Sequence, residues 1–239
     1  MVNMLTDSNQ SFLYGLHSEG LVAAATGGEV LLHPAVAESF RNLKTSALSA
    51  EIDLQVASGF RNFERQLSIW NRKASGQLTV WGDDGRPVSL SQLTEIEQVF
   101  AILRWSALPG ASRHHWGTDL DVFDAAALPA NYQVQLTLEE SNNRFARLHT
   151  WLDKQIAQST AMDFFRPYQI DRGGVAPEPW HLSYAPLAQD FQRAFSIDRL
   201  AQILMETDIA LKAVVLANLD EIYARFIEVP YSIYPSKRV

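Results

Sequence analysis

Ten residues near the middle of the chain place two histidines and two aspartates around a glycine, and this stretch constrains the fold most. Residues 112–121 read Ser-Arg-His-His-Trp-Gly-Thr-Asp-Leu-Asp. Successive side chains of a β-strand point to opposite faces, so Asp119 and Asp121 would share a face. The odd spacing from His114 to Asp121 does not fit one face of a regular strand, but a turn at Gly117 removes that conflict. The stretch therefore predicts a turn followed by a strand with one polar face.

The same stretch and a second cluster downstream offer ligands for a metal ion. Residues 178–181 read Glu-Pro-Trp-His, and the chain has no cysteine, so any metal is held by His, Asp or Glu. His114 and His115 are adjacent and would point apart, so we expect only one of them to be a ligand. With one aspartate of the stretch and His181, the site would have two nitrogens and one oxygen. A fourth position would remain for water, as in catalytic zinc sites.

Glu178 lies three residues before His181 and could act as a general acid and base. A carboxylate there could take a proton from a water molecule and pass it to a leaving amine. The alternative interpretation is that these histidines and acids form a buried polar network or a set of surface charges.

Hydrophobic periodicity along the rest of the chain predicts a mixture of helices and strands. Residues 1–30 show little periodicity, and we expect loops with a short helix there; residues 52–57 alternate apolar and polar side chains, as a half-buried strand does. Residues 164–168 resemble a buried strand or bend, and residues 76–91 an inserted hairpin. We interpret the insertion as surface decoration, with a flap over substrate as the alternative. Helical spacing predicts helices that begin near Val36, Phe63, Thr94, Phe145 and Ser196, the last with a break at Thr207-Asp208.

Arg61 falls between the strand expected over residues 52–57 and the helix expected from Phe63. Such a connection is a common place for a binding residue on a rigid scaffold. The spacing alone favours the other interpretation, a surface arginine in a salt bridge.

Charge and hydropathy exclude several classes of partner. The formal net charge is -7 and the pI is about 5.3, which argues against nucleic acid as the partner. The first residues lack the basic start and apolar run of a secretory signal, and no apolar run reaches the ~18 residues that span a bilayer. We expect no membrane span and a cytoplasmic protein, or a periplasmic one if a signal has been removed.

Taken together, the motifs resemble the zinc D-alanyl-D-alanine carboxypeptidases of the VanY type, which share a superfamily with lysostaphin-like peptidases and hedgehog domains. The resemblance covers roughly residues 52–185. It rests on Ser-Gly-Phe-Arg at residues 58–61 with Gln66, on Pro-Gly-Ala-Ser-Arg-His at residues 109–114 through Gly117 to Asp121, and on Glu-Pro-Trp-His at residues 178–181 with Tyr184.

The resemblance implies a role for each residue at a matching position. His114, Asp121 and His181 would bind Zn²⁺, and Glu178 would be the catalytic base. Arg61 would stabilise the substrate carbonyl as it becomes an oxyanion. The peptide itself would be held by Ser112 and Gln66.

Two positions depart from the family pattern. Asp119 stands where the family usually has a small apolar residue, so it would either support a ligand or compete as one. Leu182-Ser183 stands where an aromatic and a basic residue are common, which leaves the substrate preference open.

These observations predict an α+β fold, with a small antiparallel sheet that carries the zinc site and helices packed around it. Residues 1–195 would form the peptidase domain and residues 196–239 a helical extension packed on it. The expected function is zinc-dependent hydrolysis of the terminal D-Ala-D-Ala bond of peptidoglycan stem peptides. The alternatives are an L,D-carboxypeptidase, a D-Ala-D-Ala dipeptidase, or a zinc-containing module that binds peptide without cleaving it. The sequence does not determine the oligomeric state.

Overall fold

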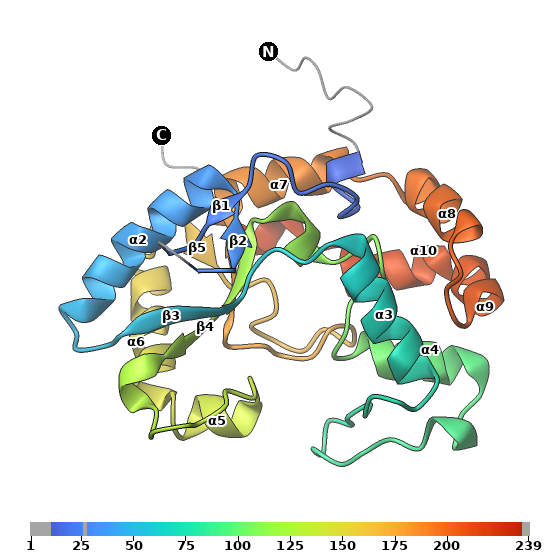
Figure 1. The fold of residues 1–239 in the computed structure, drawn as a ribbon, viewed down its shortest axis with the longest axis horizontal. Helices are drawn as coiled ribbons and strands as arrows, with labels where there is room; N and C mark the ends of the chain where they lie inside the picture. Colours follow the sequence, from blue (N-terminus) through green and yellow to red (C-terminus); the bar gives the residue numbers. More distant parts are fainter. Residues whose placement is uncertain (1–10, 26–27, 236–239) are drawn as a thin grey trace.

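A computed structural model of the chain, which describes residues 11–25 and 28–235, has the predicted α+β fold (Figure 1). Its centre is a four-stranded antiparallel sheet in the order β3-β4-β6-β5. A second sheet pairs two short strands, β1 and β2. The strands are β1 (Val22–Ala23), β2 (Leu31–Leu32), β3 (Leu54–Ser58), β4 (Asp119–Asp124), β5 (Phe164–Phe165) and β6 (His181–Tyr184).

The helices surround the sheet on both sides. In Figure 1, α2, α5 and α6 lie beside β3 and β4 on the left, whereas α3, α4 and α8 to α10 lie on the right. The α-helices are α2 (Pro34–Leu48), α3 (Phe63–Ala74), α4 (Glu95–Leu103), α5 (Leu138–Asn142), α6 (Ala146–Ala157), α7 (Ala185–Ala194), α8 (Ile197–Glu206), α9 (Lys212–Ala217) and α10 (Leu219–Ile222). The shorter helical turns are η1 (Leu90–Gln92), η2 (Arg113–Trp116), η3 (Ala125–Ala127), η4 (Tyr223–Ile227) and η5 (Tyr231–Ile233).

The two faces of the sheet have opposite character. Leu120, Val122 and Leu182 point into an apolar cluster that also contains buried side chains of α2 and α6. Because neighbouring side chains alternate, Asp119 and Asp121 point to the other face. Asp121 is paired with His181 in the β4–β6 register. This register brings a residue of each sequence cluster to one side of the sheet.

The C-terminal helices share a second apolar cluster with α3 and α4. Trp70 of α3 and Ile102 of α4 lie in it together with Leu204 of α8 and Ile222 of α10. The expected break in the tail is present, since α8 ends at Glu206 and α9 begins at Lys212. No helix in the described part of the chain is long and apolar enough to cross a membrane.

The segment expected as a hairpin, residues 76–91, forms only a rudimentary one. Trp81 and Pro87 form an isolated antiparallel bridge, and the Val88 N–H donates to the Val80 carbonyl at 2.8 Å. Proline has no N–H, so Pro87 cannot extend a ladder of hydrogen bonds. The predicted hairpin is therefore present, but as a single antiparallel bridge without two regular strands.

Candidate metal centre

The predicted turn at Gly117 connects a helical turn to the strand that carries the aspartates. Gly117 ends η2 in the left-handed conformation, with φ of 63°. A Cβ atom there would lie 2.9 Å from Leu21 Cδ2 and 3.1 Å from the His33 nitrogen, so both the conformation and the space require glycine. The two histidines thus lie on a 3₁₀ turn and not on a strand.

The adjacent histidines point in different directions, as expected. The Gly110 N–H donates to His115 Nε2 at 3.1 Å, so Nδ1 carries the proton and donates to the Arg61 carbonyl at 2.5 Å. Burial lowers the pKa of His115 to about 3. His115 is therefore a neutral residue that fixes the backbone at Arg61, and His114 alone faces the aspartates.

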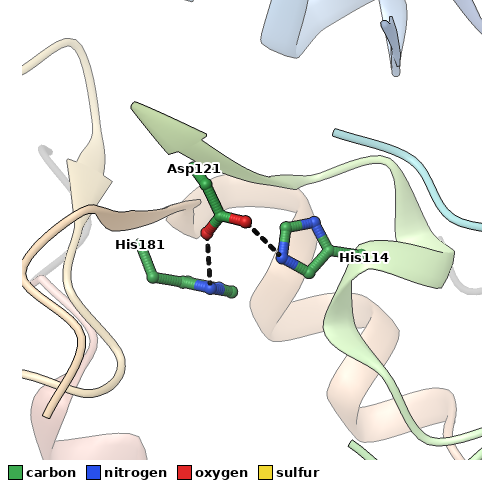
Figure 2. A group of neighbouring side chains, drawn as sticks. All are labelled: His114, Asp121 and His181. Atoms are coloured by element: carbon green, nitrogen blue, oxygen red, sulfur yellow. Dashed lines mark ion pairs between the residues drawn. The ribbon is translucent and has the colours of Figure 1, made fainter. Parts of the chain in front are cut away.

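His114, Asp121 and His181 form a buried group that could hold a metal ion (Figure 2). One donor atom from each lies within 4.8 Å of the others. Asp121 stands between the histidines, with Oδ2 3.4 Å from His114 Nε2 and Oδ1 3.3 Å from His181 Nδ1. Oδ1 of Asp121 is buried and has no hydrogen-bond partner among the described residues. Burying a carboxylate oxygen costs free energy unless a cation or a hydrogen-bond donor contacts it, so this donor set fits a metal ion.

The remaining ring nitrogens are held by hydrogen bonds that leave the donor nitrogens free. His114 Nδ1 donates to the Gly59 carbonyl at 2.8 Å, and His181 Nε2 donates to Asp119 Oδ1 at 2.9 Å. The opposite nitrogen of each ring can therefore present its lone pair to an ion. Bonds of this kind set the orientation of histidine ligands in metal sites.

The charges around the site favour a cation. Burial lowers the pKa of His114 to about 4, despite the nearby Asp121 carboxylate. Burial acts in the same direction on His181, but Asp119, Asp121 and Glu178 outweigh it and raise the pKa of His181 well above its usual value. Three carboxylates around one imidazole draw positive charge, which a proton or a metal ion can supply.

Asp119 supports His181 and does not join the group of donor atoms. Its Oδ1 accepts from Arg113 Nε at 2.8 Å as well as from His181. Its Oδ2 accepts from Thr118 Oγ1 at 2.6 Å and from Ser183 Oγ at 3.1 Å. Both oxygens are thus fully engaged and the side chain is completely buried. Of the two roles open for Asp119, the geometry favours support of a ligand.

Glu178 lies beside the donor group in a cavity of about 560 Å³. Its Oε2 is 3.4 Å from His181 Nδ1. Burial raises the pKa of Glu178, although His181 and Arg61 counteract this. His114, Asp121 and His181 also line the cavity, so this carboxylate faces the same space as the donor atoms.

Arg61 and Ser112 line the cavity, whereas Gln66 does not. Arg61 Nη1 donates to Gln66 Oε1 at 2.8 Å. Gln66 is fully buried, and its Nε2 donates to the Ala107 carbonyl at 2.7 Å. The structure thus places Gln66 behind Arg61, where it holds the guanidinium and is not positioned to touch a bound peptide.

Two cavity residues were missed at the level of the sequence. Arg113 is buried and bonds Asp119, Ser183 and, through Nη1 at 3.1 Å, Tyr234. Lys73 lies on the helical face of α3 that also carries Trp70, and it lines the cavity. A lysine on an otherwise buried helical face was the signal that could have identified it. No local pattern indicates the partners of Arg113.

Comparisons with known proteins show which family this chain is similar to. The family model for VanY, D-alanyl-D-alanine carboxypeptidase, matches residues 29–187. An uncharacterized protein of Haemophilus influenzae is 32% identical over 124 residues, which is 50% of this chain and 92% of that protein. A second uncharacterized protein of this organism is 46% identical over 71 residues, 30% of this chain and about half (49%) of that protein. A solved structure of VanYB in complex with D-alanine-D-alanine covers 78% of this chain and 90% of its own, with 19% identity and a TM-score of 0.49.

The fold and the buried donor group define a metallopeptidase. The family match covers about two thirds of the chain, and the chain belongs to the VanY family of D-alanyl-D-alanine carboxypeptidases.

Proposed function

We propose that this protein is a zinc-dependent D,D-carboxypeptidase that removes the terminal D-alanine from peptidoglycan stem peptides. The observation that carries the proposal is the position of Glu178, whose carboxylate lies 3.4 Å from the donor nitrogen of His181 inside a cavity. A module that only binds peptide has no need of a proton acceptor beside a metal ligand. Membership of the VanY family supports the choice of substrate.

His114, Asp121 and His181 would hold the ion through Nε2, a carboxylate oxygen and Nδ1. Two imidazoles and one carboxylate are a ligand set that zinc commonly takes in hydrolytic enzymes. When bound, zinc polarises a carbonyl group and lowers the pKa of a coordinated water molecule.

Glu178 supplies the proton transfers in this proposal. Its carboxylate would accept a proton from the attacking water molecule and donate it to the amine of the departing D-alanine. The raised pKa of Glu178 brings its acid and base forms closer to balance near neutral pH than those of an exposed glutamate.

Arg61 would supply positive charge next to the oxygen of the reacting carbonyl. Its guanidinium lines the cavity and donates from Nη1 to Gln66 Oε1 at 2.8 Å. A cation that is fixed before the reaction stabilises the negative charge that develops on the carbonyl oxygen without a reorganisation cost. Ser112, which also lines the cavity, would hold the peptide backbone.

The function is tested by incubating the zinc-loaded protein with a stem pentapeptide, a tetrapeptide and the D-Ala-D-Ala dipeptide while following released alanine. We expect release from the pentapeptide. Release from the tetrapeptide alone would instead identify an L,D-carboxypeptidase, and cleavage of the dipeptide alone a dipeptidase. Bound zinc without product from any of the three would identify a peptide-binding module.

The role of Glu178 is tested by Glu178→Gln. Glutamine keeps the shape but cannot accept the proton, so we expect kcat to fall by roughly 10²- to 10⁴-fold with the zinc content nearly intact. Glu206→Gln on the exposed side of α8 is the matched control and should behave like the wild-type protein. Loss of zinc from Glu178→Gln would show that Glu178 is a ligand and not the base.

A further inference from the structure

Lys73 occupies the last turn of α3, on the face that α3 turns toward the site. It lies seven residues after Gln66, which is about two helical turns or roughly 10 Å along the axis. Side chains of a helix lean toward its N-terminus, so the Lys73 side chain leans back toward Arg61, which immediately precedes α3. Lys73, Arg61 and Glu178 all line the same cavity.

In the part of the chain that the structure describes, the Lys73 ammonium has no hydrogen-bond or ion-pair partner. Four acids line the cavity. Asp83 is paired with Arg104 at 2.7 Å, Asp121 and Glu178 lie against His181, and the exposed Glu139 forms no ion pair with Lys73 among the described residues. A partly buried cation is costly without an anion, so this position is suited to an anionic group of a ligand.

The electrostatics of Lys73 agree with this position. Burial and the neighbouring Arg61 charge lower the pKa of Lys73 to about 8, while Glu178 acts in the opposite direction. The Lys73 ammonium is thus close enough to Arg61 and Glu178 to interact electrostatically with both. Near neutral pH it is still mostly protonated and able to bind an anion.

The terminal carboxylate of the proposed substrate is an anion that lies at a fixed distance from the reacting carbonyl. In a carboxypeptidase substrate the terminal carboxylate lies one residue beyond the carbonyl that Arg61 would face. Arg61 and Lys73 are separate cations that line the same cavity, and the substrate has two oxygen groups to match them, the reacting carbonyl and the terminal carboxylate. We propose that Lys73 binds the C-terminal carboxylate of the peptide substrate. This inference rests on the proposed function for the location of the carbonyl, and it explains how the enzyme would select the end of a chain.

A carboxylate could also come from a side chain of the stem peptide. Diaminopimelate carries such a carboxylate at the third residue and lysine does not, so a pair of stem peptides that differ there distinguishes the two sources. The terminal carboxylate is distinguished by a pentapeptide whose C-terminus is an amide.

The experiment measures peptide binding separately from turnover. Dissociation constants are determined by calorimetry in the zinc-loaded Glu178→Gln background, for the free-acid and amide pentapeptides, with Lys73 intact and as Lys73→Met. We expect Lys73→Met to weaken binding of the acid by about 10- to 100-fold, the range for a hydrogen bond to a charged group, and to leave binding of the amide unchanged. Lys73→Arg should restore most of the affinity, and Lys154→Met, an exposed lysine on α6, should have no effect.

Three results would overturn the assignment. Equal weakening of acid and amide would mean that Lys73 acts on the structure of the cavity and not on the terminal carboxylate. Weakening that appears only with the diaminopimelate peptide would transfer the role to the side-chain carboxylate. No weakening at all would exclude Lys73 from peptide binding. Acid-selective binding without turnover in the wild-type protein would leave the Lys73 assignment standing while rejecting the proposed catalysis.

Discussion

At the scale of single residues, the hydrogen-bond partners of each carboxylate determine which one can act as a metal ligand. Asp119 and Asp121 are two residues apart on the same face of β4, yet one is paired with Ser183 and the other with His181. Within the described residues, Asp121 Oδ1 has no hydrogen-bond partner, whereas both Asp119 oxygens accept hydrogen bonds. The cross-strand register therefore distinguishes two carboxylates that are equivalent by spacing.

Replacing Asp119 tests whether it holds His181 for the metal. In Asp119→Asn the side chain keeps its size but loses the negative charge opposite Arg113 and the strong acceptor for His181 Nε2. Changes to such supporting partners typically cost 10- to 100-fold in metal affinity, so we expect the zinc Kd to rise by about that factor. The measurement is a competition titration with a chelator.

The control for this substitution is Asp190→Asn, because Asp190 is exposed and, among the described residues, forms an ion pair only with Arg193, at 3.1 Å. An unchanged zinc Kd in Asp119→Asn would show that the imidazole of His181 is oriented by packing alone. Complete loss of zinc with a normal fold would instead make Asp119 a ligand.

The donor residues can be predicted from the sequence, but their supporting contacts cannot. His114 and Asp121 are close along the chain, and Gly117 indicates the turn between them, so local geometry limits which residues can be the metal ligands. Arg113 bonds side chains 70 and 121 residues away, which only the packing of the whole chain brings together. The position of Gln66 behind Arg61 could not be predicted for the same reason, because it depends on a hydrogen bond to the distant Ala107 carbonyl.

At the scale of the secondary-structure elements, most helices follow their apolar periodicity and the irregular segments do not. The helix predicted after Thr94 begins at Glu95, with the Glu97 carboxylate accepting from the Thr94 N–H at 2.8 Å. The insertion over residues 76–91 is anchored by a residue outside it, because Asp83 of the insertion accepts a hydrogen bond from Arg104. Arg104 also bonds Asp171. A pairing with distant charges leaves no periodic signal in the sequence of the insertion itself.

The contact between α6 and the segment after β5 makes stability depend on pH. His149 of α6 is buried against Arg166, which also pairs with Asp153 one turn further along α6. Burial and the Arg166 charge lower the pKa of His149 to about 3. The unfolded chain has a histidine pKa of about 6.5, so it binds the proton first as the pH falls. The stability contribution of neutral His149 is therefore complete above about pH 6.5 and is lost as the pH falls towards 3.

His149→Gln removes this titration while keeping a polar side chain beside Arg166. Since each pKa unit corresponds to about 1.4 kcal/mol, we expect the wild-type protein to lose about 2 kcal/mol more than the variant between pH 7 and pH 5. Urea unfolding of both proteins at a series of pH values measures the difference. Parallel stability curves over this range would mean that His149 is protonated in the folded protein.

At the scale of the whole molecule, the C-terminal segment reaches the back of the metal centre. The Tyr234 hydroxyl accepts from Arg113 Nη1 at 3.1 Å and donates to Gln192 Oε1 at 3.1 Å. Arg113 in turn bonds Asp119, which bonds His181. A segment beyond the family match at residues 29–187 therefore contributes to the support of a ligand within it.

The coupling between the C-terminal segment and the metal centre is tested by Tyr234→Phe, with Tyr231→Phe as the matched control. The Tyr231 ring stacks on Tyr234 but is 44% exposed, and its hydroxyl forms no hydrogen bond within the described residues. Loss of the Tyr234 hydroxyl leaves Arg113 and Gln192 each short of one buried partner, so we expect about 1 to 2 kcal/mol less unfolding free energy. Because Arg113 bonds both Tyr234 and Asp119, the zinc Kd should also rise a few-fold, while the control changes neither quantity. A stability loss without any change in zinc Kd would confine the role of Tyr234 to packing of the C-terminal segment.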